Sequence, residues 1–236
     1  MRGKRAINPY SLSIMNGIYI SDWRTGASAA IAAKYLANDN VKKIAMIGAG
    51  AQGKTASVCL HQIFPVAQIA VADISSERRQ TFISEMQENF QINISDAPTV
   101  ESAVSGADVV VLLTTAKEPI VKKEWVAEGC VTLAMGSYQQ TEDRLILGSD
   151  KIIVDSWGQA EHRGELKKLA ELGKIAEKDI YAELGFIAAG RKPARTNSRE
   201  RILAVLVGLG AHDVFIAGQV YKKALEEELG QTIQLD

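Results

Sequence analysis

Short apolar runs alternate with longer mixed segments through the middle of the chain. Helices are predicted at 52–63 and 76–89, where apolar and polar residues recur with helical spacing. Around them lie five runs typical of strands, at 42–48, 67–73, 107–115, 130–136 and 150–156. Continuous apolar strands bounded by helices are typical of a parallel sheet covered on both faces. The pattern therefore predicts an α/β fold with a doubly wound parallel sheet.

The two ends of the chain have a different pattern. Residues 12–20 alternate as a strand or hairpin arm would, and the Ala-rich residues 25–39 predict a helix. Towards the C-terminus we expect an amphipathic helix over 160–173, a late strand within 201–210 and a long helix over 212–229.

The charge and residue composition exclude some classes of binding partner. The net charge is -1 and no run of Lys or Arg exceeds two residues, so we expect neither nucleic acid nor an anionic membrane surface. No apolar stretch reaches the length of a membrane-spanning helix. Cys59 and Cys130 lie in apolar stretches, as free thiols do in a reducing compartment, and the three histidines are too scattered for a metal site. These features predict a cytoplasmic protein without a bound metal.

The loop GAGAQGKT fits two nucleotide-binding motifs. Gly48, Gly50 and Gly53 form G-x-G-x-x-G, the fingerprint of dinucleotide-binding folds. The same loop with Lys54 and Thr55 forms G-x-x-x-x-G-K-[ST], the phosphate loop of nucleoside triphosphatases. The first motif predicts hydride chemistry with NAD, and the second predicts phosphoryl transfer with ATP and magnesium.

Asp73 favours the dinucleotide interpretation. It ends the second predicted strand, twenty residues after Gly53, where dinucleotide-binding folds carry an acid for the ribose hydroxyls. A phosphate loop would instead need a strand-end Asp for its metal, such as Asp155. Because a carboxylate at position 73 repels a 2′-phosphate, NAD is the expected cofactor. Arg78 and Arg79 follow closely and would suit a 2′-phosphate, which keeps NADP as the alternative, but they are more simply interpreted as exposed residues of the next helix.

The motif also suggests how the chain is divided. We predict a Rossmann-type domain over 25–208 that binds NAD(P). Residues 1–24 and 209–236 would form part of a second lobe, which serves substrate binding and dimerisation.

From residue 16 onward, six stretches taken in order resemble the ornithine cyclodeaminase/μ-crystallin family. They are WRTGASAAIAAKYLA, IGAGAQG, LLTTAKEP, DSWGQAEHRGEL, IYAELGFIAAGRKPAR and GLGAHDVFIAGQVYKKA. The resemblance covers nearly the whole chain. It implies NAD(P)-dependent hydride transfer at a carbon that bears an amine or imine next to a carboxylate.

The resemblance assigns roles to single residues. Arg24 matches an arginine that binds the substrate carboxylate beside the cofactor, and Val207 lies in a segment near the nicotinamide. Ala51 and Gln52 match a pair that contacts the pyrophosphate, and Asp73 matches the ribose acid. The other cofactor-binding positions that it implies, besides the loop glycines, are Thr25, Thr114, Thr115, Gly136, Ser137 and Leu206.

Two features depart from the family pattern. Tyr138 stands where the cyclodeaminases carry a general-base Asp, and Asp143 is too far along the chain to replace it. The remaining catalytic carboxylate candidate is Asp213, whose alternative role is to cap the last helix; His212 is a weaker acid/base candidate. The family also has an N-terminal segment, with further Lys and Arg ligands, that precedes this chain. A fragment, a chain completed from elsewhere and a lost lobe are the three explanations, and an incomplete lobe predicts an apolar face and a homodimer.

The leading hypothesis is an NAD-dependent oxidoreductase acting on a small amino or imino acid, as an amino-acid dehydrogenase or a ketimine reductase. The alternatives are an ornithine cyclodeaminase, a crystallin-like protein that binds NAD(P) without turnover, and an ATPase.

Overall fold

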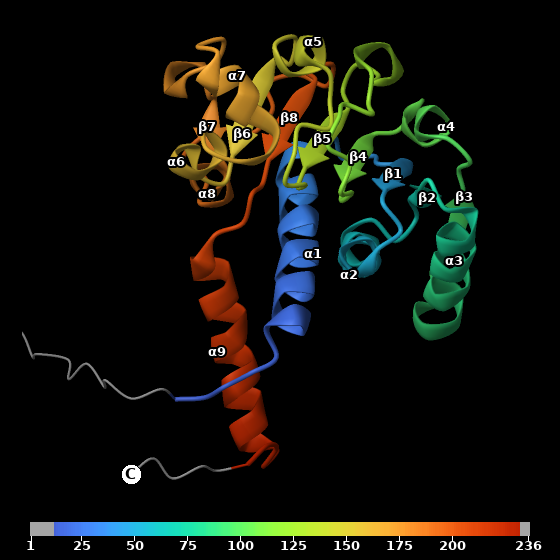
Figure 1. Ribbon diagram of the computed structural model, residues 1–236, viewed down its shortest axis with the longest axis vertical. Coiled ribbons are helices and arrows are strands. Elements are labelled where there is room, and N and C mark those ends of the chain that lie inside the picture. Colours follow the sequence, from blue (N-terminus) through green and yellow to red (C-terminus); the bar gives the residue numbers. More distant parts are fainter. Residues whose placement is uncertain (1–11, 232–236) are drawn as a thin grey trace, which may run out of the picture.

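The computed structural model describes residues 12–231 (Figure 1). They contain an eight-stranded sheet in the order β3-β2-β1-β4-β5-β8-β6-β7, and every pair of neighbouring strands is parallel. The strands are β1 (Lys43–Ile47), β2 (Gln68–Ala72), β3 (Ile94–Asp96), β4 (Val109–Leu112), β5 (Val131–Ala134), β6 (Lys151–Val154), β7 (Ala182–Glu183) and β8 (Ile202–Val205). The predicted doubly wound α/β fold is confirmed.

Helices cover both faces of the sheet, which explains why its central strands are almost entirely apolar. Ile44 and Met46 of β1 belong to the core on one face, and Ala45 and Ile47 belong to the core on the other. The first core includes residues of α1 (Gly17–Leu36), α2 (Ala51–Ile63), α3 (Ser76–Phe90) and α8 (Leu184–Ala188). The second includes residues of α4 (Val100–Val104), α5 (Asp143–Ile146), α6 (Trp157–Ala160) and α7 (Lys167–Glu171). Three short 3-10 turns complete this part of the fold: η1 (Lys123–Trp125), η2 (Gly164–Leu166) and η3 (Glu177–Asp179).

Helix α1 packs closely against α2, the helix that follows the glycine loop. A Cβ atom added at Gly26 would lie 2.7 Å from the backbone carbonyl carbon of Thr55, so the two helix backbones meet at this glycine. The Thr55 hydroxyl donates a hydrogen bond to the Asp22 carbonyl oxygen at 2.8 Å. These contacts fix the first turns of α1 beside the glycine loop.

Helix α9 (Gly210–Glu226) follows the last strand and extends away from the sheet alongside α1 (Figure 1). None of its residues is buried, although it carries Val214, Phe215, Val220 and Leu225. Helix α9 therefore presents apolar side chains that this chain does not cover.

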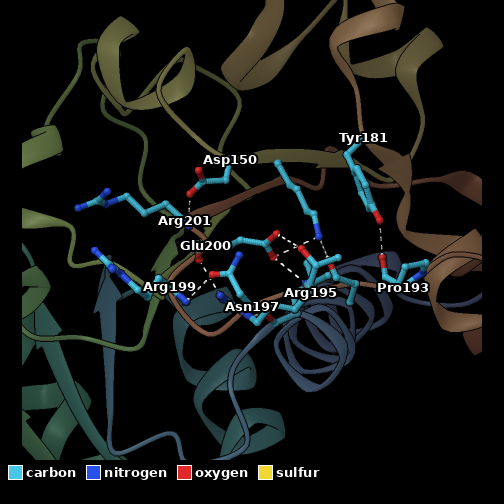
Figure 2. A network of polar contacts seen from close by, with 12 residues as sticks. Asp150, Tyr181, Pro193, Arg195, Asn197, Arg199, Glu200 and Arg201 are labelled. Carbon is cyan, nitrogen blue, oxygen red and sulfur yellow. Dashed lines mark hydrogen bonds and ion pairs between the residues drawn. The ribbon is translucent and has the colours of Figure 1, made fainter.

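A polar network holds the amino ends of β6 and β8 (Figure 2). Lys151 and Glu200 form a buried ion pair at 3.1 Å. The Arg195 guanidinium donates hydrogen bonds to the carbonyl oxygens of Leu36, Gly129 and Glu200 at 2.9, 2.8 and 2.6 Å. This network ties the end of α1 to the amino edge of the sheet, opposite the glycine loop.

The strand predicted for residues 12–20 is wrong, because α1 already begins at Gly17. The Asn16 side chain caps it by accepting a hydrogen bond from the Ile18 N–H at 3.0 Å. The predicted domain boundary at residue 24 falls inside α1, and the parts of the predicted second lobe at 1–11 and 232–236 lie outside the described residues. The division into 25–208 and a second lobe therefore remains a proposal.

Two predictions near the C-terminal half also need correction. The single helix predicted over 160–173 is broken into α6, η2 and α7, since Gly164 adopts a φ of 74°. Asp213 does not cap α9: the N-cap is Leu209, without a side-chain hydrogen bond, and Asp213 lies within the first turn.

Candidate active site

The carboxyl ends of the central strands bring the predicted residues to one edge of the sheet. Gly48 follows β1, Thr114 lies just beyond β4, and Gly136 and Leu206 lie just beyond β5 and β8. The chain runs from β1 outward to β2 and β3 and then returns to the other side of β1 as β4. Such a reversal of strand order opens a crevice above the carboxyl ends, which is where doubly wound sheets bind nucleotides.

Each glycine of the loop has its own structural reason. Gly48 has a φ of 114°, and a Cβ atom there would lie 2.3 Å from the Leu113 carbonyl oxygen. A Cβ atom at Gly53 would lie 2.3 Å from the Gly48 carbonyl oxygen, so this position allows close packing of α2 on the loop. Gly50 is the N-cap of α2 and faces open space, which leaves room for a phosphate against the backbone.

Asp73 lies directly beside this loop at the end of β2. Its carboxylate accepts hydrogen bonds at 3.0 Å from the Ala49 N–H and at 3.0 Å from the Ser75 N–H. Arg79 is buried, not exposed as expected, and binds Asp96 at 2.6 Å and the Asp73 carbonyl oxygen at 2.8 Å. The guanidinium of Arg79 is thus already engaged by the protein, which disfavours a role in binding a 2′-phosphate.

The partners of Lys54 and Thr55 contradict the phosphate-loop interpretation. Lys54 forms an ion pair with Glu85 of α3, and the Thr55 hydroxyl is turned towards α1. Asp155 follows β6, which is separated from β1 in the sheet by β4, β5 and β8. The triad of residues that a triphosphate and its magnesium ion require is therefore not assembled here.

Arg24 and Asp213 meet although they are 189 residues apart. The Arg24 Nε donates to Asp213 Oδ1 at 3.0 Å, and the Arg24 side chain is 17% exposed. Gly208 lies under the guanidinium with a φ of 87°, and a Cβ atom there would be 2.4 Å from Arg24 Nη1. Helices α1 and α9 and the β8 loop thus fix the direction of this arginine together.

Arg24 opens onto a pocket of about 310 Å³. Its wall is mostly apolar, with Met135 and Leu206 from the sheet edge and Phe215 from α9. His212 also lines it, and its buried Nδ1 has no hydrogen-bond partner among the described residues. A cation beside an apolar wall suits a small carboxylate with an apolar remainder.

Asp155 closes one side of this pocket, a placement that the sequence analysis did not foresee. Burial raises the pKa of its carboxyl group, against the effect of hydrogen bonds from backbone N–H groups. Two of these bonds come from Gly208 at 2.6 Å and Ser156 at 2.9 Å. Asp155 therefore anchors the loop that carries Gly208 beneath Arg24.

The residues around position 138 are now placed. Tyr138 is 44% exposed, with the Lys117 ammonium 6.0 Å from its ring. The Asp143 carboxylate accepts a hydrogen bond from Gln139 Nε2 at 2.7 Å and pairs with Lys174 at 3.8 Å. Asp143 therefore has a structural partner on each side and does not replace the missing base.

Gln140 and Glu165 lie beside the candidate site and were not predicted from the sequence. Gln140 is fully buried and binds Thr114, and Glu165 is 1% exposed and binds Gln140 and Thr141. No sequence motif indicates that the Glu165 carboxylate is buried, since only the fold shows that it faces inward.

Within residues 12–231 no group of three or more His, Cys, Asp or Glu could hold a metal ion. Over the same residues, no helix is long and apolar enough to cross a bilayer.

The carboxyl edge of the sheet thus carries the glycine loop with Asp73 beside it, and a mostly apolar pocket that contains Arg24. Residues 6–228 match the family model of the ornithine cyclodeaminase/mu-crystallin family, and the chain belongs to this family. The resemblance described from its motifs is thereby confirmed.

Characterised relatives span most of this chain. It is 34% identical over 228 residues to an alanine dehydrogenase of Archaeoglobus fulgidus, covering 95% of this chain and 70% of the relative. The structure of the Thermococcus litoralis Δ(1)-pyrroline-2-carboxylate reductase in complex with NADH and L-proline superposes with a TM-score of 0.88 at 32% identity, covering 94% of this chain and 70% of that one. An archaeal alanine dehydrogenase dimer with bound NAD gives a TM-score of 0.89 at 33% identity, covering 96% and 71%.

Proposed function

We propose that the protein is an NAD-dependent oxidoreductase that transfers a hydride between the nicotinamide and the α-carbon of a small amino or imino acid. The observation that carries the proposal is the joint placement of the glycine loop, Asp73 and the Arg24 pocket at one edge of the sheet. The relatives support it, since one is an alanine dehydrogenase and another is a reductase solved with NADH and L-proline.

The cofactor is NAD, and its site runs along the loops at the carboxyl edge. The α2 N-terminus, with Ala51 and Gln52, would bind the pyrophosphate, and Asp73 the adenosine ribose. The engagement of Arg79 by Asp96 supports NAD over NADP. The positions proposed along the rest of the cofactor are Thr25, Thr114, Thr115, Gly136, Ser137 and Leu206.

Arg24 would bind the substrate carboxylate, with Val207 nearby. A guanidinium pairs with a carboxylate through two parallel N–H groups, which gives direction as well as charge. Because the Arg24 Nε is held by Asp213, the Nη groups remain to face the ligand. This ion pair supports a role for Asp213 in orienting Arg24, as an alternative to the catalytic role predicted for it.

The Asp213→Asn variant separates the two roles. If Asp213 orients Arg24, the KM for the amino or imino acid rises while the pH profile of kcat keeps its shape. If Asp213 is the proton-transferring group, kcat falls by roughly 100-fold or more and one limb of that profile disappears.

A panel of reactions tests the proposed function itself. We expect NAD reduction with alanine, proline or a related amino acid, or NADH oxidation with the matching imino acid. Since Tyr138 replaces the general-base Asp, we expect no conversion of ornithine to proline with release of ammonia. Stoichiometric NADH binding without turnover across the whole panel would favour the crystallin-like alternative and contradict the proposal.

We further propose that the protein forms a homodimer through α1 and α9. Large apolar side chains on these helices are exposed, among them Ile18, Tyr19, Val214, Phe215 and Leu225. Large apolar side chains exposed on two neighbouring helices are typical of an interface. The archaeal alanine dehydrogenase relative was solved as a dimer, which supports the same assembly here.

We also propose a cytoplasmic location, supported by the two free thiols. Cys130 is buried, and burial raises its pKa to about 12. Such a thiol is unreactive and is typical of a protein kept in reducing surroundings.

A further inference from the structure

A set of buried hydrogen bonds connects the loop after β4 to the loop after β5. Gln140 Nε2 donates to the carbonyl oxygen of Thr114 at 2.8 Å and lies at 2.8 Å from the Thr114 hydroxyl oxygen. Gln140 has no exposed surface, so water does not compete for these bonds. The two loops are thus joined by one amide group.

Glu165 fixes the backbone on which this amide is carried. Its carboxylate accepts hydrogen bonds from the Gln140 N–H at 2.9 Å, from the Thr141 N–H at 2.8 Å and from the Thr141 hydroxyl. Burial raises the pKa of Glu165, and these hydrogen bonds act in the opposite direction by stabilising the charged form. We call Thr114, Gln140, Thr141 and Glu165 the loop clamp.

Because Gly136 has no side chain, the Gln140 amide of the loop clamp can lie directly against its backbone. A Cβ atom at this position would lie 2.8 Å from Gln140 Nε2 and 2.9 Å from Gln140 Oε1. Gly164, directly before Glu165, lies against the same loop: a Cβ atom there would be 3.3 Å from the Gly136 carbonyl oxygen. The backbone at Gly136 is therefore packed between the amide of Gln140 and the turn that carries Glu165.

We infer that Gln140 and Glu165 are positioning residues that hold the β4 and β5 loops at the separation required to bind the nicotinamide half of the cofactor. This rests on the proposed function, in which Thr114, Gly136 and Ser137 face that half. Loops at a sheet edge move readily unless their side chains are locked by buried hydrogen bonds. Neither Gln140 nor Glu165 touches the cofactor; each acts through Thr114 and the β5 loop.

The Gln140→Met variant tests this inference, with Gln139→Met as the matched control. Methionine keeps the length of the side chain but donates no hydrogen bond to Thr114. Gln139 is also buried and also donates two hydrogen bonds, to the Thr141 carbonyl oxygen at 3.0 Å and to Asp143 at 2.7 Å. The bond to Thr141 stays within the β5 loop, and neither bond reaches Thr114 in the β4 loop. Both variants should lower the melting temperature, whereas only Gln140→Met should weaken NADH binding strongly.

The readout is the Kd for NADH from fluorescence titration, measured beside thermal unfolding of the apoprotein. Loss of the two bonds to Thr114 predicts a Kd roughly 5- to 50-fold higher for Gln140→Met, against a change within about twofold for Gln139→Met. In steady-state assays the KM for NADH rises in Gln140→Met more than the KM for the amino or imino acid. Equal NADH affinity in the two variants would overturn the inference.

A double-mutant cycle with Gly136→Ala provides a second test. In the wild-type background the added methyl group displaces the Gln140 amide and weakens NADH binding. In a Gln140→Ala background the space is already free, so the same methyl group has a smaller effect and the two changes are not additive. Additive losses would show that Gly136 acts independently of Gln140, which contradicts the clamp. A wild-type protein that fails to bind NADH at all would instead remove the proposed function.

Discussion

At the scale of single residues, the site depends on glycines at positions where a side chain would not fit. Gly48 and Gly208 adopt φ values of 114° and 87°, and a Cβ atom at either would collide with backbone or with Arg24. The glycine loop could be identified from its sequence because the G-x-G-x-x-G motif consists of the positions at which the loop requires glycine. The need for glycine at position 208 could not be predicted, because it arises from the guanidinium of Arg24, which comes from the other end of the chain.

Gly208→Ala should weaken substrate binding by displacing Arg24. Gly173→Ala is the matched control, since Gly173 also has a positive φ of 66° but nothing lies within 4 Å of its added Cβ atom. Both variants introduce backbone strain of roughly 1–2 kcal/mol, visible in urea unfolding. Only Gly208→Ala should also raise the KM for the amino or imino acid. A similar KM in the two variants would mean that Arg24 does not depend on the space at Gly208.

At the scale of elements, helix and strand order follows from the apolar pattern, while breaks within elements do not. The central strands β1, β2, β4, β5, β6 and β8 were predicted because each is apolar and buried on both faces. The edge strands β3 and β7 were missed because they are short and only partly buried. The start of α1 was missed since residues 12–20 alternate, yet the Asn16 cap and the packing against α2 make 17–36 one helix. The broken segment 160–173 has helical periodicity, and its break at Gly164 depends on tertiary contacts with Val207 and Gly136.

The buried Lys151–Glu200 pair should control stability in acid. Burial alone would raise the pKa of Glu200, but hydrogen bonds from Thr196 and Lys151 and the charge of Lys151 outweigh it and lower the pKa to about 2. Because the folded-state pKa is below the unfolded value, this stability is present above pH ~4.5 and is lost as the pH falls towards ~2. The expected loss is about 3 kcal/mol in the free energy of unfolding.

Urea unfolding of Glu200→Gln between pH 6 and pH 2 checks this expectation. The variant should be less stable at pH 6 by roughly 3 kcal/mol and should show a shallower acid dependence. Glu128→Gln is the control, because Glu128 pairs with Arg199 at 2.7 Å on the exposed surface. An acid dependence in Glu200→Gln as steep as in the wild type would assign the effect to other carboxylates.

At the scale of the whole molecule, α1 and α9 connect the site to the proposed dimer. Helix α9 extends away from the sheet beside the N-terminal part of α1 (Figure 1), and the Arg24–Asp213 ion pair joins the first halves of the two helices. Apolar residues beyond this pair remain uncovered within the described residues. An assembly through these helices would therefore stabilise the direction of Arg24 as well as cover apolar surface.

The Val214→Glu/Leu225→Glu double variant should dissociate the dimer, because the helical repeat brings these two exposed side chains to the same face of α9 and the variant places two charges there. Light scattering coupled to size exclusion measures the mass directly. Val66→Glu is the control, as Val66 is 89% exposed but lies beyond the end of α2. A wild-type protein that is monomeric at micromolar concentration would contradict the proposed dimer. A double variant that stays dimeric would contradict the proposed interface through α9.

The central claim, that the glycine loop and Asp73 bind NAD, is tested most directly by titrating NADH into the wild type, Asp73→Ala and Lys54→Ala. We expect saturable binding to the wild type, unchanged affinity in Lys54→Ala and an affinity roughly 10- to 100-fold lower in Asp73→Ala, which loses the charged acceptor for the ribose hydroxyls. Binding that is equal in Asp73→Ala and the wild type, or that is abolished by Lys54→Ala, would contradict the account.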